Sequence, residues 1–169
     1  MKTLILGGAR SGKSRLAERL AHDSGRSVTV VATAQAQDDE MASRIAAHRA
    51  ARPAHWRCVE EPLALADTLR AADAPGALLL VDCLTLWLSN LLHAGEAVVV
   101  RERAALLDAL PALQSELLLV GNEVGHGIVP LGALNRRFVD ENGWLHQALA
   151  EHCDAVRFVM AGCTLALKG

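Results

Sequence analysis

The segment from Gly7 to Ser14 reads GGARSGKS and matches the pattern G-x-x-x-x-G-K-[ST]. Gly7 and Gly12 permit backbone angles that other residues avoid, so consecutive N–H groups can turn inward around phosphate oxygens. Lys13 supplies a compact positive charge for the β- and γ-phosphates, and the Ser14 hydroxyl can ligate Mg²⁺. An apolar stretch precedes this segment and a helical one follows it, as such a loop requires. The sequence therefore predicts a binding site for a nucleoside triphosphate.

Two acidic residues follow other apolar stretches of strand length. Asp82 comes directly after 78–81, and Glu123 follows 117–120 just past Gly121 and Asn122. The carboxyl ends of parallel strands share one edge of a sheet with a phosphate-binding loop, so either carboxylate could orient a metal ion or its waters. Asp82 is the better candidate, although either acid could instead cap a following helix or turn.

A histidine stands among arginines in the helical segment 39–52. Arg44, His48 and Arg52 fall at i, i+4 and i+8 and form one stripe, with Arg49 adjacent. Such a stripe could hold a second phosphate group, or neutral His48 could attack phosphorus while the arginines offset the developing charge. A solvated helix face with a surface histidine has the same spacing, so the pattern alone leaves both interpretations open.

The segment NEVGHGIVP at 122–130 follows an apolar stretch of strand length. It is too rich in glycine for a helix and too apolar for a plain solvent loop. Loops of this kind often carry substrate contacts on a rigid scaffold, although an ordinary mobile connection is the alternative.

The composition excludes several classes of protein. With 169 residues, 51% of them hydrophobic, the chain suits one domain covering 1–169 with a sizeable core. The net charge of −2, the absence of Tyr and the presence of only 2 Phe argue against a nucleic-acid binder. The four cysteines are far apart and form no CxxC pair, which favours reduced thiols. Without a signal-peptide pattern or an apolar run of membrane-spanning length, a cytoplasmic protein is expected.

Apolar runs of strand length alternate along the chain with stretches of helical periodicity. The expected strands cover 3–6, 27–32, 78–81, 117–120 and 156–160, with a short edge strand at 56–59. The expected helices cover 14–22, 39–52, 63–72, 85–92, 101–110 and 132–151. Because strand–helix–strand repeats need crossover connections, we predict an α/β fold with a mostly parallel sheet flanked by helices.

These segments together resemble the bifunctional adenosylcobinamide kinase / adenosylcobinamide-phosphate guanylyltransferase family of cobalamin biosynthesis, over nearly the whole chain. The matching stretches are GGARSGKSR at 7–15, VATAQAQDDEMASRI at 31–45, HRAARPAHW at 48–56, DCLTLWLSNLL at 82–92 and NEVGHGIVP at 122–130. The phosphate loop alone fits many families, whereas HRxxRPxxW together with NEVGxGIVP is highly specific.

The resemblance implies two reactions on one RecA-like P-loop NTPase fold. First, ATP or GTP phosphorylates the aminopropanol hydroxyl of adenosylcobinamide. Second, GTP donates GMP to an active-site histidine with release of pyrophosphate, and the histidine passes GMP to the phosphorylated substrate. An imidazole suits this role because it is both a nucleophile and a leaving group near neutral pH.

Matching residue by residue, the resemblance implies that His48 is the nucleophile and that Lys13 is the other catalytic residue. It places the triphosphate at Gly7, Gly8, Ala9, Arg10, Ser11, Gly12, Lys13 and Ser14. Further nucleotide contacts are implied for Ala32, Thr33, Ala34, Arg49, Ala50, Ala51, Arg52, Glu60 and Asp82. Mg²⁺ would be bound by Ser14 and Asp82, and the family assembles as homotrimers.

One departure from the family pattern lies near the carboxyl end. Gly143 is followed by Trp144, where the family commonly has arginine. If that arginine contacts substrate phosphate or a neighbouring subunit, Arg136 or Arg137 would have to replace it. Two alternatives stay open: a single-function P-loop kinase without a covalent intermediate, and a regulatory ATPase that acts on a partner.

Overall fold

The computed structural model describes residues 1–35 and 39–169, without the side chains of Glu40, Met41, Arg44, Ile45, His48 and Ala51. Its strands are β1 (Lys2–Gly7), β2 (Ser27–Ala32), β3 (Arg57–Glu60), β4 (Ala77–Asp82), β5 (Glu116–Asn122), β6 (Ala155–Met160) and β7 (Cys163–Lys168). Its helices are α1 (Lys13–Asp23), α2 (Asp39–Ala51), α3 (Leu65–Ala72), α4 (Leu84–Ala94), α5 (Glu96–Ala109) and α6 (Ala133–His152), with a short 3₁₀ turn at Leu110–Ala112.

The strands form one seven-stranded sheet in the order β3-β2-β4-β5-β1-β6-β7. Neighbouring strands run parallel, except that β7 pairs antiparallel with β6. The predicted α/β fold with a mostly parallel sheet is therefore confirmed, including the edge position of the short strand predicted at 56–59. This order puts β5 between β1 and β4, so the predicted phosphate loop and Asp82 lie two strands apart.

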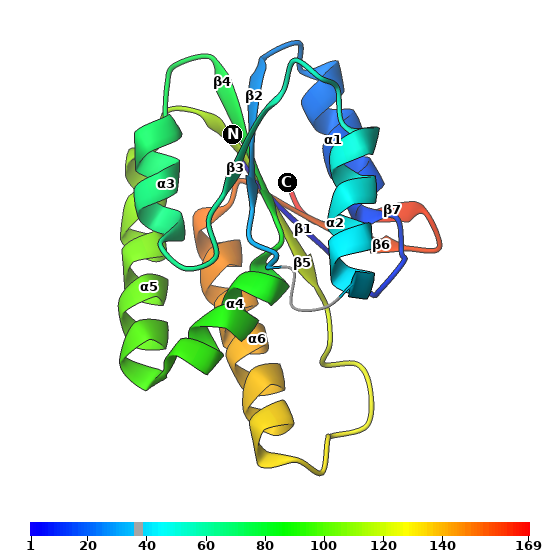
Figure 1. Ribbon diagram of the computed structural model, residues 1–169, viewed down its shortest axis with the longest axis vertical. Coiled ribbons are helices and arrows are strands. Elements are labelled where there is room, and N and C mark those ends of the chain that lie inside the picture. The colour runs from blue at the N-terminus through cyan, green and yellow to red at the C-terminus, as the bar shows by residue number, and fades with distance from the viewer. Residues whose placement is uncertain (36–38) are drawn as a thin grey trace.

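Helices cover both faces of the sheet, with α1 and α2 on one side and α3, α4, α5 and α6 on the other (Figure 1). Alternate residues of the central strands enter different cores: Leu4 belongs to the cluster under the larger helix layer, and Ile5 packs with Leu16 of α1. Because both faces are covered, the central strands read as continuous apolar runs, which is why the sequence identified them.

The structure differs most from the sequence prediction at two places. Strand β7 was not predicted, because its residues are all exposed and form no buried apolar run. Helix α5 begins at Glu96, five residues before the predicted start at 101, directly after Gly95 with its φ of 116°. The β-branched run 98–100 weakens the helical signal there, although Val99 is buried in the core.

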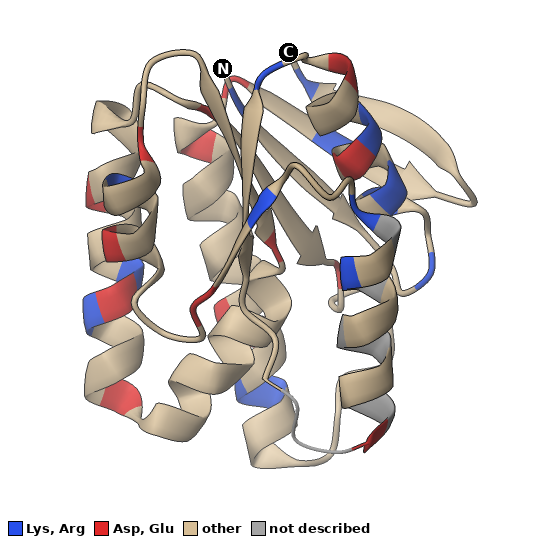
Figure 2. Ribbon diagram, turned by 45° about the horizontal axis from the view of Figure 1, so that its top comes forward, with Lys and Arg blue, Asp and Glu red and all other residues tan. Residues whose placement is uncertain are grey.

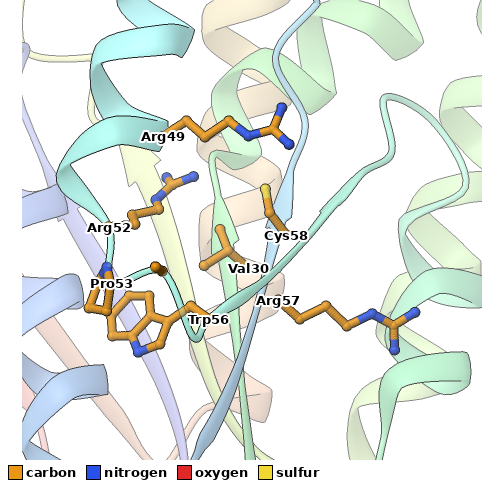
Figure 3. A pocket seen from close by; sticks show the side chains of 8 residues that line it. Val30, Arg49, Arg52, Pro53, Trp56, Arg57 and Cys58 are labelled. Atoms are coloured by element: carbon orange, nitrogen blue, oxygen red, sulfur yellow. The ribbon is translucent and has the colours of Figure 1, made fainter.

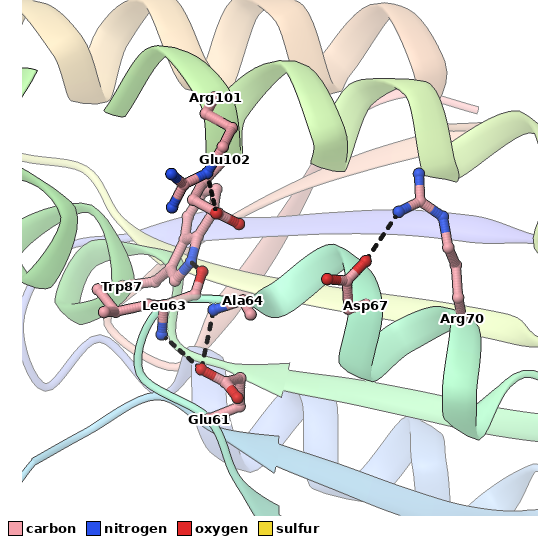
Figure 4. Close-up of polar contacts among 8 residues, drawn as sticks. All are labelled: Glu61, Leu63, Ala64, Asp67, Arg70, Trp87, Arg101 and Glu102. Atoms are coloured by element: carbon pink, nitrogen blue, oxygen red, sulfur yellow. Dashed lines mark hydrogen bonds and ion pairs between the residues drawn. The ribbon is translucent and has the colours of Figure 1, made fainter. Parts of the chain in front are cut away.

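A network of polar contacts fixes the connection between β3 and α3 (Figure 4). The Glu61 carboxylate accepts hydrogen bonds from the N–H groups of Leu63 and Ala64, both at 2.8 Å. The buried Trp87 of α4 donates its indole N–H to the Leu63 carbonyl at 2.8 Å. These bonds satisfy backbone groups where α3 starts, two residues after the predicted boundary. None of the helices within the described residues has the length and apolarity needed to cross a bilayer.

Candidate active site

Four of the predicted site positions lie together because the strand ends are in register. Ala32 at the end of β2 pairs with Glu60 of β3 on one side and with Asp82 of β4 on the other. On the far side of β5, Gly7 ends β1 opposite Asn122. The carboxyl ends of the parallel strands thus form one edge, the usual place for a ligand in an open α/β sheet.

The predicted phosphate loop connects β1 to α1 at this edge. Gly12 precedes the helix with a φ of 102°, and Arg10 also adopts a left-handed backbone with a φ of 55°. A side chain at Gly7 would collide with the Val159 carbonyl and lie 2.7 Å from the Ser11 hydroxyl. The turn after β6 closes on the loop as well, since the Gly162 N–H donates to the Ser11 carbonyl at 2.9 Å. The loop is therefore fixed from two sides.

Lys13 stands at the first position of α1 and is largely buried, with 9% of its surface exposed. Its ammonium group donates to the Gly8 carbonyl at 3.2 Å. Burial lowers the pKa of Lys13, while the neighbouring Cys83 and Asp82 act in the opposite direction. The helix N-terminus and this cation point at the same place, which is the arrangement that favours a bound anion.

Basic residues gather around this loop. In Figure 2 they recur along α1 and at the end of α2, on the side of the sheet from which the loop departs. Arg10 of the loop is exposed, and Arg15 of α1 lies close to Gly162. A local positive field can thus exist although the net charge of the chain is −2.

Thr33 joins the ends of β2 and β4. Its hydroxyl donates to the Cys83 carbonyl at 2.7 Å and accepts from the Cys83 N–H at 3.0 Å. The side chain is fully buried, with 0% exposure, and the Thr33 carbonyl accepts from the Asn90 side-chain amide at 2.9 Å. The Thr33 side chain therefore joins the ends of β2 and β4, whereas Ala32 and Ala34 beside it are half-buried.

Arg52 and Asp82, two predicted site residues from different elements, are bound to each other. A terminal guanidinium nitrogen of Arg52 donates to Asp82 Oδ2 at 2.6 Å, and Arg52 Nε lies 3.5 Å from Glu18 Oε1 of α1. The Arg52 side chain is only 9% exposed. The end of α2 is thereby held against both the strand that carries Asp82 and the helix that follows the phosphate loop.

The residues predicted to bind Mg²⁺ have the right chemistry for it. Ser14 offers a hydroxyl and Asp82 a carboxylate, the hard oxygen donors that this ion prefers, and the Asp82 charge acts on Lys13, the residue before Ser14. Arg52 occupies Asp82 Oδ2 in this conformation. The donor set fits the ion when Arg52 moves away from Oδ2 or when the ion binds Asp82 through Oδ1.

A pocket of about 280 Å³ lies beside this ion pair, between the end of α2 and the strands β2 and β3. Figure 3 shows Arg49 and Arg52 extending over Val30, while the buried Trp56 forms one wall and Arg57 extends away from them. Arg49 also lies 3.7 Å from the exposed Glu60 carboxylate. A pocket with an indole wall and cationic groups at one side can take a flat ring that carries a phosphate.

His48 lies on α2, one turn before Arg52. Its side chain is outside the described part of the structure, as is that of Ala51. Ala50 and Arg49 are exposed on the same helix. The predicted helix over 39–52 is confirmed to within one residue, and the catalytic role of His48 stays a prediction.

A buried polar cluster lies at the end of β5, where the sequence indicated only Glu123. The Glu123 N–H donates to the Gly7 carbonyl at 3.0 Å, which ties this residue to the start of the phosphate loop. His146 of α6 is buried, with its Nδ1 3.6 Å from Glu123 Oε2. No spacing in the sequence indicated His146, since a lone histidine in a long helix carries no pattern of its own.

The loop after β5 leads to α6 without a helix, as predicted for 122–130. Arg136 donates to the Pro130 carbonyl at 3.1 Å and also to the Leu131 carbonyl, so it braces the loop. Arg137 forms an ion pair with Glu96 of α5. Trp144 stands 54% exposed on α6. Both arginines considered as replacements at the Trp144 position are thus engaged within the chain.

The sequence matches the family model described as cobinamide kinase / cobinamide phosphate guanyltransferase over residues 3–167. The chain belongs to this family. It is 62% identical to the bifunctional adenosylcobalamin biosynthesis protein CobP of Pseudomonas aeruginosa, covering 100% of this chain and 98% of that protein. It is 40% identical to the bifunctional adenosylcobalamin biosynthesis protein CobU of Escherichia coli, covering 99% and 100%. The resemblance inferred from the motifs is confirmed.

Among solved structures, the fold of this family member resembles that of the RadB recombinase. The match has a TM-score of 0.51 at 14% sequence identity and covers 93% of this chain and 73% of the other. At this identity the likeness concerns the fold alone. It confirms the expected RecA-like P-loop NTPase architecture.

Proposed function

We propose that the protein phosphorylates adenosylcobinamide with ATP or GTP and then transfers GMP from GTP to the product. The end products are adenosylcobinamide-GDP and pyrophosphate, formed during assembly of the cobalamin nucleotide loop. The observation that carries the proposal is the phosphate loop with buried Lys13 at the same sheet edge as Asp82, in a chain whose family is defined over 3–167.

In the first reaction, the backbone N–H groups of 7–14 would surround the triphosphate, and Lys13 would offset charge on the transferred phosphoryl group. The P–O bond to the β-phosphate breaks as the substrate oxygen bonds to the γ-phosphorus, so charge spreads over the phosphoryl oxygens. Ser14 and Asp82 would bind Mg²⁺, which neutralises part of the triphosphate charge when it is bound. The rigid loop supports this role because its groups need not reorganise during transfer.

In the second reaction, neutral His48 would attack the α-phosphorus of GTP and displace pyrophosphate. A phosphate oxygen of adenosylcobinamide phosphate would then attack the same phosphorus and release the histidine. Arg49 and Arg52 would stabilise the charge on the GMP phosphate, and the pocket that they line, with Trp56 as one wall, would hold the guanine. The covalent intermediate splits one difficult transfer into two easier ones.

Incubation with α-labelled GTP and Mg²⁺ tests the covalent step. We expect acid-labile, base-stable label on the protein and no label on His48→Ala. The matched control is His55→Ala, an exposed histidine in the same segment, which should label normally. Phosphorylation of adenosylcobinamide without any protein label would identify a single-function kinase. Slow hydrolysis without stimulation by adenosylcobinamide would favour a regulatory ATPase.

We also propose that the protein assembles as a homotrimer in the cytoplasm, with the corrinoid at a subunit interface. Several large apolar side chains after β5 are strongly exposed, as a surface used for association would be: Ile128 (97%), Val129 (71%), Leu131 (97%) and Leu134 (57%). Sedimentation equilibrium tests the assembly. A monomer with full activity would contradict this proposal.

A further inference from the structure

The two proposed reactions differ in what they require of a base. The first uses an alcohol as nucleophile, and an alcohol must lose its proton as its oxygen bonds to phosphorus. The second uses a phosphate monoester, which is already ionised near neutral pH. A carboxylate that serves only the first reaction should therefore exist, provided that the proposed function holds.

Most acids near the nucleotide edge are engaged elsewhere. Asp82 is bound by Arg52 at 2.6 Å. The exposed Glu60 belongs to the edge strand β3, and Glu61 accepts two backbone N–H groups at the start of α3. Glu123 differs because it extends β5, the direct neighbour of the strand that leads into the phosphate loop. Its own N–H donates to the Gly7 carbonyl at 3.0 Å.

The Glu123 carboxylate has a polar neighbour on each of two sides. Oε1 accepts the Gly125 N–H at 2.6 Å, and Oε2 faces His146 Nδ1 at 3.6 Å. Only 19% of the Glu123 side chain and 6% of the His146 side chain are exposed. Gly125 permits this approach, since a Cβ there would lie 2.9 Å from Glu123 Oε1. The carboxylate thus has one hydrogen-bonded oxygen, faces an imidazole with the other and is still partly open to solvent.

His146 is a buried residue whose ring nitrogens form no hydrogen bond with the described residues. Its Nε2 lies 2.8 Å from where a Cβ of Gly121 would stand, so the glycine makes room for the ring. Neither ring nitrogen has a hydrogen-bond partner among the described residues, and the same holds for the Oδ1 atoms of Asn122 and Asn142. Buried polar atoms nearly always form hydrogen bonds, so several unpaired ones beside one carboxylate indicate a functional site.

We propose that Glu123 is the general base of the alcohol phosphorylation and that His146 is the positioning residue that holds its carboxylate. As the substrate oxygen bonds to the γ-phosphorus, its proton passes to a Glu123 oxygen, and the bond from the γ-phosphorus to the β-phosphate oxygen breaks. The nucleoside diphosphate leaves with that electron pair. Glu123 later returns the proton to water.

The Glu123→Gln variant separates this role from the rest of the site. We expect kcat for phosphorylation of adenosylcobinamide to fall roughly 100-fold or more, the usual worth of a general base. Labelling by α-labelled GTP should stay unchanged, because no alcohol is deprotonated in that step. The matched control is Glu116→Gln at the opposite end of β5, which should leave both activities intact.

Two results would overturn the assignment. Unchanged phosphorylation by Glu123→Gln would exclude a base at this position, and equal loss of phosphorylation and labelling would place Glu123 on the shared triphosphate instead. Absence of both activities from the unmodified protein is a different result, which counts against the proposed function itself.

Substitution of His146 tests the positioning role. His146→Leu should lower kcat for phosphorylation without changing KM for the nucleotide or the GTP labelling. His146→Gln, whose amide can donate to Glu123, should restore part of the lost rate. His152→Gln, an exposed histidine on the same helix, is the control. A full phosphorylation rate in His146→Leu, or no difference between Leu and Gln at 146, would refute the role of His146.

Discussion

Arg52 and Asp82 bind each other across the nucleotide edge, with 2.6 Å between a guanidinium nitrogen and Oδ2. The family resemblance gives these residues separate tasks, a GMP contact for Arg52 and a metal contact for Asp82. In the structure Arg52 balances the Asp82 charge and also faces Glu18 of α1 at 3.5 Å. The same guanidinium therefore links the helix that carries His48 to both the predicted metal ligand and the helix of the phosphate loop.

Replacing Arg52 with alanine should destabilise the fold. Asp82 and Glu18 would both lose their cation, and at 17% and 27% exposure they are only partly hydrated. We expect the free energy of unfolding to fall by about 1–3 kcal/mol, less than for a fully buried pair because water screens the charges. Urea denaturation measures the change. Arg57→Ala, at an exposed position of β3, should change it by less than about 0.5 kcal/mol. Equal effects of the two substitutions would contradict a structural role for the Arg52 contacts.

Replacing Gly7 with alanine should damage the phosphate loop. The new methyl group would press against the Val159 carbonyl, which belongs to the backbone of β6, and against the Ser11 hydroxyl. We expect a loss of about 1–3 kcal/mol in stability, as for overpacked sites, together with loss of triphosphate binding by calorimetry. Gly143→Ala is the matched control, since nothing lies within 4 Å of its added Cβ inside α6. That change should raise stability by about 0.5–1 kcal/mol. Normal binding by Gly7→Ala would show that the loop tolerates a side chain.

Replacing Thr33 with valine should loosen the sheet edge while keeping the shape of the side chain. The Cys83 N–H and carbonyl would both lose their partner in a fully buried place. We expect a decrease of about 1–3 kcal/mol in the free energy of unfolding. Thr164→Val, at an exposed position of β7, serves as the comparison and should have almost no effect. If both variants unfold at the same urea concentration, the Thr33 hydroxyl contributes nothing.

The sequence predicted the central elements because burial on both faces leaves an apolar run in each strand. It also predicted the nucleotide edge, since parallel strands put the loop at 7–14 and Asp82 on one side of the sheet. The side-chain contacts at this edge could not be predicted in the same way. Whether Asp82 faces a metal or Arg52, and whether Thr33 contacts a ligand or Cys83, depends on side-chain directions that no spacing encodes.

Strand β7 and His146 are two further features that the pattern of residues could not indicate. The strand at 163–168 is fully exposed, so periodicity of burial could not indicate it, and only its pairing with β6 defines it. His146 is buried beside β5, yet the residue that makes room for it, Gly121, is distant in sequence. Gly121 and Gly125 lie two residues before and two residues after Glu123. This spacing was the one sign in the sequence that little space surrounds the Glu123 carboxylate.

His146 should make the stability of the protein depend on pH between neutral and mildly acidic conditions. Burial lowers the pKa of its imidazole below the ordinary value of 6.5, with Glu123 opposing the shift. The unfolded chain therefore takes up a proton at this histidine at a higher pH than the folded chain does. It follows that the free energy of unfolding decreases as the pH falls below 6.5 and stops decreasing below the folded pKa.

The comparison of the unmodified protein with His146→Gln isolates this contribution, because the carboxylates common to both proteins cancel. The unmodified protein should lose stability relative to the variant as the pH falls from neutral to mildly acidic values, because the variant lacks the imidazole that takes up a proton on unfolding. Urea denaturation at several pH values measures the difference. His152→Gln, exposed on the same helix, should show no such dependence. A stability difference that stays constant across this pH range would contradict the prediction. It would mean that the imidazole titrates alike in the folded and the unfolded chain, and hence that burial does not disfavour its charged form.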